Sequence, residues 1–174
     1  FGFTPFRPGP GLGGHCIPVD PFYLSWHAKT LGMDLSFIEQ AGKINSYIPS
    51  FVVEKVISGL NDVKKCLNGS KVFVLGVAYK PNVNDTRESP ALQIISRLLR
   101  SGCQVDFNDE YVNRVMIENQ EFRSTEINEG KINYYDLVLM LTDHDYFEET
   151  KFVNFKGIIV DTRNFFKKLP KIVA

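Results

Sequence analysis

KVFVLGVA at residues 71–78, SPALQIISRLLRSG at residues 89–102 and QVDFN at residues 104–108 together decide the fold. After its first lysine the opening run carries only apolar residues and one glycine, which is typical of a buried strand. The second stretch begins with a serine–proline pair, typical of a helix start, and ends with a glycine, typical of a helix stop. The order strand, helix, strand predicts an α/β domain with a parallel, doubly wound sheet.

Two further strands are expected downstream, at residues 137–141 and 157–160. Residues 111–131, which lie before them, are weakly patterned and are expected to be helical. Residues 142–145 follow directly on a strand, so we expect them to form a capping and turn segment.

The residues upstream of the sheet are expected to be helical. Residues 20–32 and residues 36–60 both carry apolar side chains at helical spacing. Asp20 is expected to cap the first helix, with Pro21 at its first position. Pro49 is expected to kink or restart the second helix, because proline lacks the N–H that a helix interior needs.

A polar stretch at residues 61–70 is the candidate linker between the helical part and the sheet. The chain is therefore expected to divide into residues 1–68, with a glycine-rich loop at residues 1–14 and the two helices, and an α/β domain at residues 69–174. It begins inside a proline- and glycine-rich motif, without a start methionine or a targeting pattern, and is expected to be a piece of a longer protein.

The composition is that of a globular domain, with 44% apolar and 23% charged residues in a chain of 174. Twenty basic residues balance twenty acidic ones, so neither nucleic acid nor an anionic membrane is the expected partner. No apolar run approaches the roughly 20 residues that span a bilayer. Three widely separated cysteines favour free thiols in a reducing cytoplasm over a disulfide framework.

The clearest candidate for chemistry is GPGLGGHCIPVDP at residues 9–21. A cysteine is a nucleophile only as a thiolate, so catalytic thiols lie in polar, partly exposed places, often beside a helix N-terminus. Cys16 lies four residues before the expected helix start, among glycines that would let backbone N–H groups approach a ligand. Asp20 could hold a water or a lysine. The alternative is a small buried cysteine among glycines that only make turns.

Two other interpretations of this motif are weaker. A dyad of His15 with Cys16 is disfavoured, because adjacent side chains seldom point the same way. A metal site is not expected, because His15, Cys16 and Asp20 match no common zinc spacing.

A second candidate is GVAYKPNVNDTRESP at residues 76–90, directly after the first strand. Ligands of open α/β sheets bind at the carboxyl ends of the strands, where Lys80 and Arg87 fall. The following helix start offers free N–H groups to an anion. A GxGxxG sequence is missing, so this is not an ordinary dinucleotide-binding fingerprint.

The third candidate is IIVDTRN at residues 158–164, which puts Arg163 just past the last strand. Arg163 and Lys80 share one edge of the expected sheet, and two cations there would suit a diphosphate. The alternative for each of these two cations is a solvated surface charge.

Asp109 follows the second strand and either meets a ribose hydroxyl or caps a turn.

Three motifs, the first two of them long, give the chain a recognisable resemblance: PGPGLGGHCIPVDPFYL at residues 8–24, GVAYKPNVNDTRESPA at 76–91 and VDTRN at 160–164. In order and spacing they resemble the UDP-glucose/GDP-mannose dehydrogenase family, over nearly the whole chain from Arg7 to Lys167. The resemblance implies a helical segment followed by a Rossmann-like domain that binds a UDP-sugar. It also implies a homodimer formed through the central helix.

The family oxidises the sugar C6 alcohol to a carboxylate with two NAD, through a thiohemiacetal and a thioester on the motif cysteine. By resemblance Cys16 is this nucleophile, and Asp20 positions water or stabilises the oxyanion. The cofactor is NAD, with Val19 and Arg87 beside it. The expected substrate contacts are Arg7, Pro8, Gly9, Gly11, Gly13, Gly14, Tyr79, Lys80 and Arg163. The family's NAD-binding domain and its catalytic lysine and asparagine precede Phe1, so the chain alone is expected to be inactive.

GGHCIPVDP followed by FYLSW resembles the branch that acts on UDP-N-acetylhexosamines, with UDP-N-acetylglucosamine favoured over UDP-N-acetylmannosamine. UDP-glucose is a further alternative, although enzymes for it tend to carry other residues where this chain has His15 and Val19. A different class of function is a non-catalytic module that binds a nucleotide sugar. A third interpretation is a structural fragment that mediates oligomerisation, and this is compatible with a dehydrogenase.

Overall fold

The computed structural model describes residue 2 and residues 7–174, so Phe1 and residues 3–6 of the expected N-terminal loop lie outside the described part. Residues 7–14 form neither helix nor strand, as their prolines and glycines predict. The elements in chain order are α1 (Asp20–Thr30), α2 (Ser36–Asp62), β1 (Lys71–Leu75), α3 (Pro90–Arg100), β2 (Gln104–Asn108), β3 (Arg114–Ile117), β4 (Gln120–Arg123), η1 (Ile132–Tyr134), β5 (Leu137–Met140), η2 (Glu149–Phe152), β6 (Ile158–Asp161) and β7 (Ile172–Val173).

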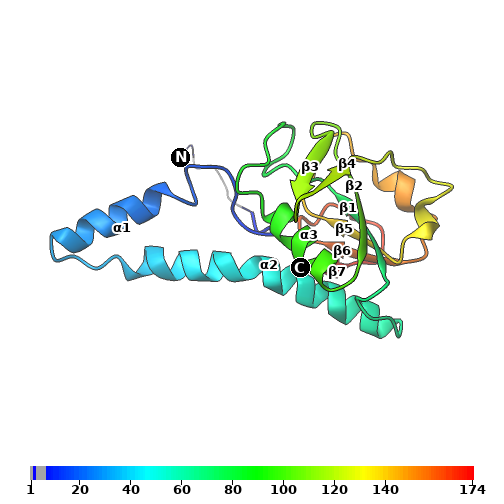
Figure 1. Cartoon of the computed structure of the whole chain (residues 1–174), viewed down its shortest axis with the longest axis horizontal. Helices are drawn as coiled ribbons and strands as arrows, with labels where there is room; N and C mark the ends of the chain where they lie inside the picture. Colours follow the sequence, from blue (N-terminus) through cyan, green and yellow to red (C-terminus); the bar gives the residue numbers. More distant parts are fainter. Residues whose placement is uncertain (1, 3–6) are drawn as a thin grey trace.

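The molecule has two regions (Figure 1). A sheet forms the core of an α/β domain, against which α3 and the second half of α2 pack. Helix α1 and the first half of α2 form a hairpin that extends away from this domain, and we call this hairpin, residues 20–48, the arm. No helix in the described part of the chain is long and apolar enough to cross a bilayer.

The sheet is parallel throughout, in the order β2-β1-β5-β6-β7. The chain moves from β1 through α3 to β2 and then returns to β5 on the other side of β1, which makes a topological switch point between β1 and β5. At that point Gly76 has φ +79°, and a Cβ there would collide with Thr142 in the loop after β5. The predicted parallel α/β sheet is confirmed.

Side chains of β1 alternate between the two faces of the sheet. Val72 and Val74 belong to the core cluster that includes residues of α2 and α3. Phe73 and Leu75 belong to a second cluster on the opposite face, with rings such as Phe152. This second face is covered by the short turns η1 and η2 and by aromatic side chains, whereas the α-helices cover the first.

Helix α2 does not restart at Pro49, contrary to one of the two outcomes expected there. Pro49 is buried inside the continuous helix, directly after the last residue of the arm. From there on Val52, Val56 and Leu60 are fully buried in the core of the domain. Their tertiary packing offsets the hydrogen bond that the proline removes.

The predicted helix at residues 111–131 is wrong. This segment contains the antiparallel hairpin β3–β4, closed by Glu118 and Asn119, both with positive φ. Positive φ at both turn residues is the geometry that matches strand twist in a two-residue hairpin. Val115 and Ile117 are buried while their neighbours are exposed, so the segment follows a period of two and not a helical period.

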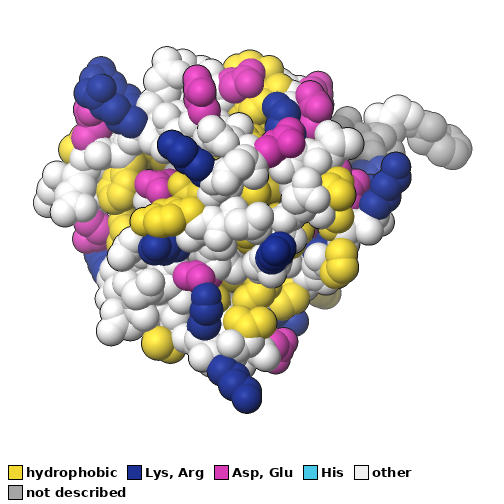
Figure 2. All heavy atoms as spheres, turned by 90° about the vertical axis from the view of Figure 1, so that its right-hand side faces the viewer, with side chains coloured by type: hydrophobic (Ala, Val, Ile, Leu, Met, Phe, Trp, Pro, Cys, Tyr) yellow, Lys and Arg dark blue, Asp and Glu magenta, His cyan; other side chains and the backbone are white. Residues whose placement is uncertain are grey.

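The end of the domain opposite the arm carries basic and acidic side chains interspersed with apolar ones (Figure 2). No patch of one sign dominates this face, in agreement with the balanced composition.

Candidate functional site

The glycine-rich segment at residues 9–14 lies across the carboxyl edge of the sheet, and we call it the glycine loop. A Cβ at Gly13 would lie 2.6 Å from the Cβ of Tyr79, and one at Gly14 would lie 2.9 Å from the Tyr79 ring. Gly9 passes equally close to the Arg163 guanidinium. At Gly13 a side chain would lift the loop off Tyr79, whereas at Gly9 it would displace the flexible end of the Arg163 side chain.

Two hydrogen bonds hold the glycine loop in place. The Gly14 N–H donates to the Arg87 carbonyl at 3.0 Å, and the Leu12 N–H donates to Oδ1 of Asn45 on α2 at 2.9 Å. Behind the loop lies a cavity of about 430 Å³, bounded by the starts of α1 and α3 and by α2. The glycine loop therefore forms one wall of this cavity and contacts both the arm and the α/β domain.

Asp109 organises the loop that follows β1, and the hypothesis that it meets a ribose is wrong. Its side chain is 0% exposed. Oδ2 accepts from the N–H of Val77 at 2.8 Å and of Ala78 at 3.1 Å, and Oδ1 accepts from the N–H of Tyr111 and Val112. With both oxygens occupied, the carboxylate has no place for a ligand. Burial alone would raise its pKa, but the hydrogen bonds from His144, Val77 and Ala78 outweigh burial and lower it.

His144 is the most important residue that the sequence interpretation missed. Its Nδ1 accepts from the Asn82 N–H at 2.9 Å, so Nε2 carries the proton and donates to Asp109 at 3.0 Å. The ring is 0% exposed and stacks on both Tyr111 and Tyr146, with centroids 5.0 and 5.4 Å away, and these two tyrosines also contact each other. Residues 142–145 were expected to be only a turn, and nothing local in them signals this long-range contact.

Arg163 connects three segments at the sheet edge. Its Nε donates to the Leu141 carbonyl at 3.0 Å and lies 3.4 Å from Oδ1 of Asp143, while its guanidinium faces Gly9. The side chain is 18% exposed. Burial lowers its pKa from the ordinary value and Asp143 acts in the opposite direction. A half-enclosed guanidinium suits an anion that enters from the loop side.

The other expected substrate contacts are less enclosed. Lys80 is exposed, with Nζ 5.4 Å above the ring of Tyr79. Since β5 lies between β1 and β6, the loops that carry Lys80 and Arg163 start roughly 10 Å apart. Arg7 and Pro8 are exposed at the start of the glycine loop, and Tyr79 is half-buried beneath it.

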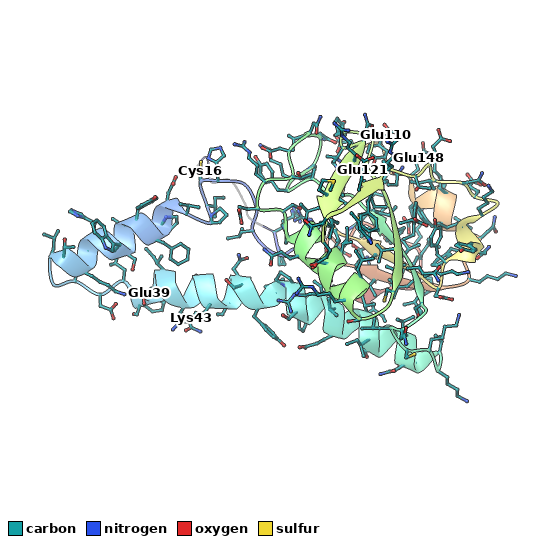
Figure 3. All side chains as sticks on the ribbon, viewed as in Figure 1. Cys16, Glu39, Lys43, Glu110, Glu121 and Glu148 are labelled. Atoms are coloured by element: carbon teal, nitrogen blue, oxygen red, sulfur yellow. The ribbon has the colours of Figure 1, made fainter. Side chains whose placement is uncertain are left out.

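Cys16 and His15 are brought together, contrary to the expectation that adjacent side chains point apart. The distance from the Cys16 Sγ to the His15 Nδ1 is 3.2 Å, and both residues are exposed. The backbone turns here, because the Cys16 carbonyl accepts from the N–H of Val19 at 3.1 Å and of Asp20 at 2.8 Å. Figure 3 shows Cys16 between α1 and the α/β domain.

Asp20 is the first residue of α1 and not its cap, so the expected capping role is wrong. Val19 occupies the cap position, its side chain is exposed, and Pro21 is the second helical residue. An acidic residue in the first turn still interacts favourably with the helix dipole. Among residues 2 and 7–174, no three His, Cys, Asp or Glu side chains gather as a metal site would require.

Arg87 is fixed by an ion pair within its own loop. Its Nη2 lies 2.6 Å from Oδ2 of Asp85, and its Nε donates to both oxygens of that carboxylate at 3.0 Å. The hydrogen bond from Arg87 lowers the pKa of Asp85 to about 2. Asp85 in turn raises the pKa of Arg87, with smaller contributions from Tyr79 and Cys16. The guanidinium is thus held within electrostatic range of the Cys16 thiol.

Comparisons with known proteins agree with this architecture. Residues 73–168 match the UDP-binding domain of the UDP-glucose/GDP-mannose dehydrogenase family, and residues 1–47 match the central domain of the same family. The chain is 34% identical over 91% of its length to a UDP-N-acetyl-D-mannosamine dehydrogenase from Methanocaldococcus jannaschii, of which it covers 35%. It is 31% identical over 89% of its length to a UDP-N-acetyl-D-glucosamine 6-dehydrogenase from Salmonella typhi, of which it covers 36%. It therefore spans about a third of the length of these relatives.

A solved structure, of the UDP-D-ManNAc dehydrogenase from Pyrococcus horikoshii, resembles the chain with a TM-score of 0.78 and 29% identity. The match covers 97% of this chain and 39% of that one. The GDP-mannose dehydrogenase from Pseudomonas aeruginosa, at 20% identity and a TM-score of 0.74 over 96% of this chain and 40% of its own, shares the fold. The chain belongs to the UDP-glucose/GDP-mannose dehydrogenase family.

Proposed function

We propose that the chain forms the UDP-sugar end of an NAD-dependent nucleotide-sugar 6-dehydrogenase. The observation that carries the proposal is the position of the glycine loop, which lies directly on Tyr79 and Arg163 at the carboxyl edge of the sheet. That edge holds the switch point, where open α/β sheets bind their ligands. Backbone N–H groups of the loop and the Arg163 guanidinium would then face the same anion.

The diphosphate would be held mainly by Arg163, because its guanidinium is partly enclosed and already oriented by Leu141 and Asp143. Lys80 would add a second, more mobile cation from the loop after β1. The sugar and the phosphates would be enclosed by the glycine loop and the two residues before it, namely Arg7, Pro8, Gly9, Gly11, Gly13 and Gly14. Tyr79 would pack against the sheet side of this loop.

Cys16 would act on the sugar C6 as an exposed nucleophile beside the N-terminus of α1. NAD, when bound, accepts a hydride from the C6 carbon at each oxidation. The Cys16 thiolate adds to the aldehyde carbon to form a thiohemiacetal, which becomes a thioester once its hydride has left. Water then attacks the thioester carbon, the C–S bond breaks, and the carboxylate and the thiol are released. Asp20 would position this water or stabilise the oxyanion.

Val19 and Arg87 fit a position beside NAD, because both are exposed on the Cys16 side of the molecule. The GxGxxG match in the sequence, GPGLGG at residues 9–14, neither follows a strand of the described part nor opens directly into a helix, so it is not a dinucleotide-binding fingerprint for the pyrophosphate. We therefore expect no NAD-coupled turnover from this chain alone, and a steady increase in NADH absorbance with any UDP-sugar would contradict that expectation.

The proposed substrate class is a UDP-N-acetylhexosamine, with UDP-N-acetylglucosamine as our first choice. The two curated relatives described above are named for the mannosamine and the glucosamine derivative, so both support the class and leave UDP-N-acetylmannosamine as the first alternative. UDP-glucose is the second alternative.

We further propose that α2 forms a homodimer through the arm, with residues 1–68 and 69–174 as separate functional parts. Phe37, Ile44 and Tyr47 on the first half of α2 are exposed, and such side chains favour association. Sedimentation of the chain would test this: an Ile44→Asp variant should be monomeric where the parent chain is dimeric.

Calorimetric titration with UDP, UDP-N-acetylglucosamine, UDP-N-acetylmannosamine and UDP-glucose tests the proposed site. Arg163→Ala should weaken UDP binding roughly tenfold to a hundredfold, the range expected for a lost charge-assisted hydrogen bond. Arg123→Ala, which removes an exposed arginine of β4, is the matched control and should leave the affinity unchanged. Equal affinities in parent and Arg163→Ala would contradict the proposed site.

A non-catalytic module that binds a nucleotide sugar remains the alternative of another class. Alkylation of Cys16 in an active enzyme containing this chain separates the two functions: loss of turnover with UDP binding retained supports the dehydrogenase.

A further inference from the structure

We propose that His15 is the base that removes the thiol proton of Cys16, so that the two side chains form an imidazolium–thiolate pair. The inference rests on the proposed role of Cys16 as nucleophile and names the group that activates it. A free thiol is mostly protonated near neutral pH, with an ordinary pKa of about 8.5, so a nucleophilic cysteine needs such a partner.

The two side chains are in direct contact. The Cys16 Sγ and the His15 Nδ1 are 3.2 Å apart, within hydrogen-bond range for sulfur. The flanking backbone is fixed on both sides: Gly14 donates to the Arg87 carbonyl, and the Cys16 carbonyl accepts from Val19 and Asp20. The contact is thus set by a held turn that brings two adjacent side chains to the same side.

The surrounding charges suit both members of the pair. In the loop after β1, the Asp85 carboxylate interacts with His15 and would stabilise an imidazolium, while the Arg87 guanidinium interacts with Cys16 and would stabilise a thiolate. Tyr79 lies in the same loop, and its electrostatic interaction reaches Arg87. The first turn of α1 contributes Asp20. Because Asp85 and Arg87 are paired with each other, the loop after β1 holds the two groups in a fixed geometry.

The proton transfer is balanced without a further reactant. The S–H bond of Cys16 breaks and an N–H bond forms at the His15 Nδ1, while Nε2 keeps its own proton. The net charge of the pair is unchanged and nothing is oxidised. The thiolate is then free to add to the aldehyde carbon of the substrate.

The test is the rate at which iodoacetamide alkylates each cysteine between about pH 5 and pH 9, with the modified peptides separated by mass. Cys66 is exposed and serves as the reference thiol within the same chain. Near pH 6.5 Cys16 should react at least about tenfold faster than Cys66. His15→Asn should slow Cys16 about tenfold at that pH and leave its rate near pH 9 almost unchanged.

His27→Asn removes another exposed histidine, on α1, and is the matched control; it should leave the Cys16 profile unchanged. His15→Gln is the second variant, and circular dichroism of each variant verifies that it folds. A Cys16 profile that is identical in the parent, His15→Asn and His15→Gln would overturn the proposal, as would equal rates at Cys16 and Cys66. Alkylation requires neither UDP nor NAD, so this result is independent of whether the proposed UDP site fails.

Discussion

The α/β domain and the arm differ in how completely each buries its own side chains. In the domain the strands β1 and β5 are almost wholly buried, and the buried side chains of Asp109 and His144 hydrogen-bond to each other. In the arm Trp26 is 67% exposed and Phe37 is 91% exposed, and α1 buries only Ser25 and Ala28. Helical stability comes mainly from the packing of an apolar face, so the domain is expected to be stable by itself and the arm is not.

The largest effect should come from the buried pair in the domain. Asp109→Ala leaves His144 and four backbone N–H groups without their acceptor, and should lower the free energy of unfolding by about 3–5 kcal/mol. Urea unfolding measures this change. Asp34→Ala, at an exposed position between α1 and α2, is the control and should stay within about 0.5 kcal/mol. Equal changes in the two variants would remove the contrast between the regions.

The next effect compares the two halves of a single helix. Leu60→Ala opens a cavity against the sheet and should cost about 2–5 kcal/mol of unfolding free energy. Ile44→Ala, in the arm half of α2, should change it by no more than about 0.5 kcal/mol in the monomer. A large loss from Ile44→Ala at low protein concentration would show that the arm is packed more tightly than its exposure indicates.

The third effect concerns the glycine loop, which joins the two regions. Gly13→Ala places a Cβ against Tyr79 and the Glu88 carbonyl, an overpacking that costs about 1–3 kcal/mol. We expect the loop to lift and so relieve this overpacking, with the result that UDP affinity falls roughly tenfold while the unfolding midpoint of the domain changes little. The control is Gly32→Ala, whose Cβ strains the turn after α1, where φ is +73°, but meets no neighbouring atom; it should leave UDP affinity unchanged.

The smallest effect is the pH dependence of the Asp85–Arg87 pair, which is exposed. The folded-state pKa of Asp85 is lowered to about 2, below the ordinary carboxyl value. The pair therefore stabilises the fold above that ordinary value, and this contribution disappears as the pH falls through about 2. The difference in unfolding midpoint between the parent and Asp85→Asn should shrink in acid; a difference independent of pH would contradict the assignment.

Elements that depend on local signals were predictable from the sequence. The apolar run of β1, the serine–proline start of α3 and its glycine stop are each determined within a few residues, and the structure has both elements where they were expected, although β1 ends at Leu75 and not at Ala78. The β3–β4 hairpin was not predictable in the same way, because strand pairing and the positive φ of Glu118 and Asn119 depend on contacts outside the turn. Pro49 likewise stays helical because of burial against other elements.

The candidate site likewise divides into features set by local sequence and features set by distant contacts. The glycine loop and the carboxyl-edge position of Arg163 follow from contiguous motifs and from the rule for parallel sheets. The roles of Asp109 and His144 do not, since the contacts that join them to each other and to the loop after β1 span 31 to 62 residues of sequence. The contact between His15 and Cys16 depends on a backbone turn that residue types alone do not specify.

The most direct test of the account is to map UDP onto the chain by the changes it causes in backbone amide NMR shifts. The account predicts the largest changes in the glycine loop, around Tyr79 and at Arg163, with β3–β4 and the arm tip unaffected. Changes confined to the cavity at residues 130–135, which lies at the amino ends of the strands, would contradict it, as would the absence of any change at saturating UDP.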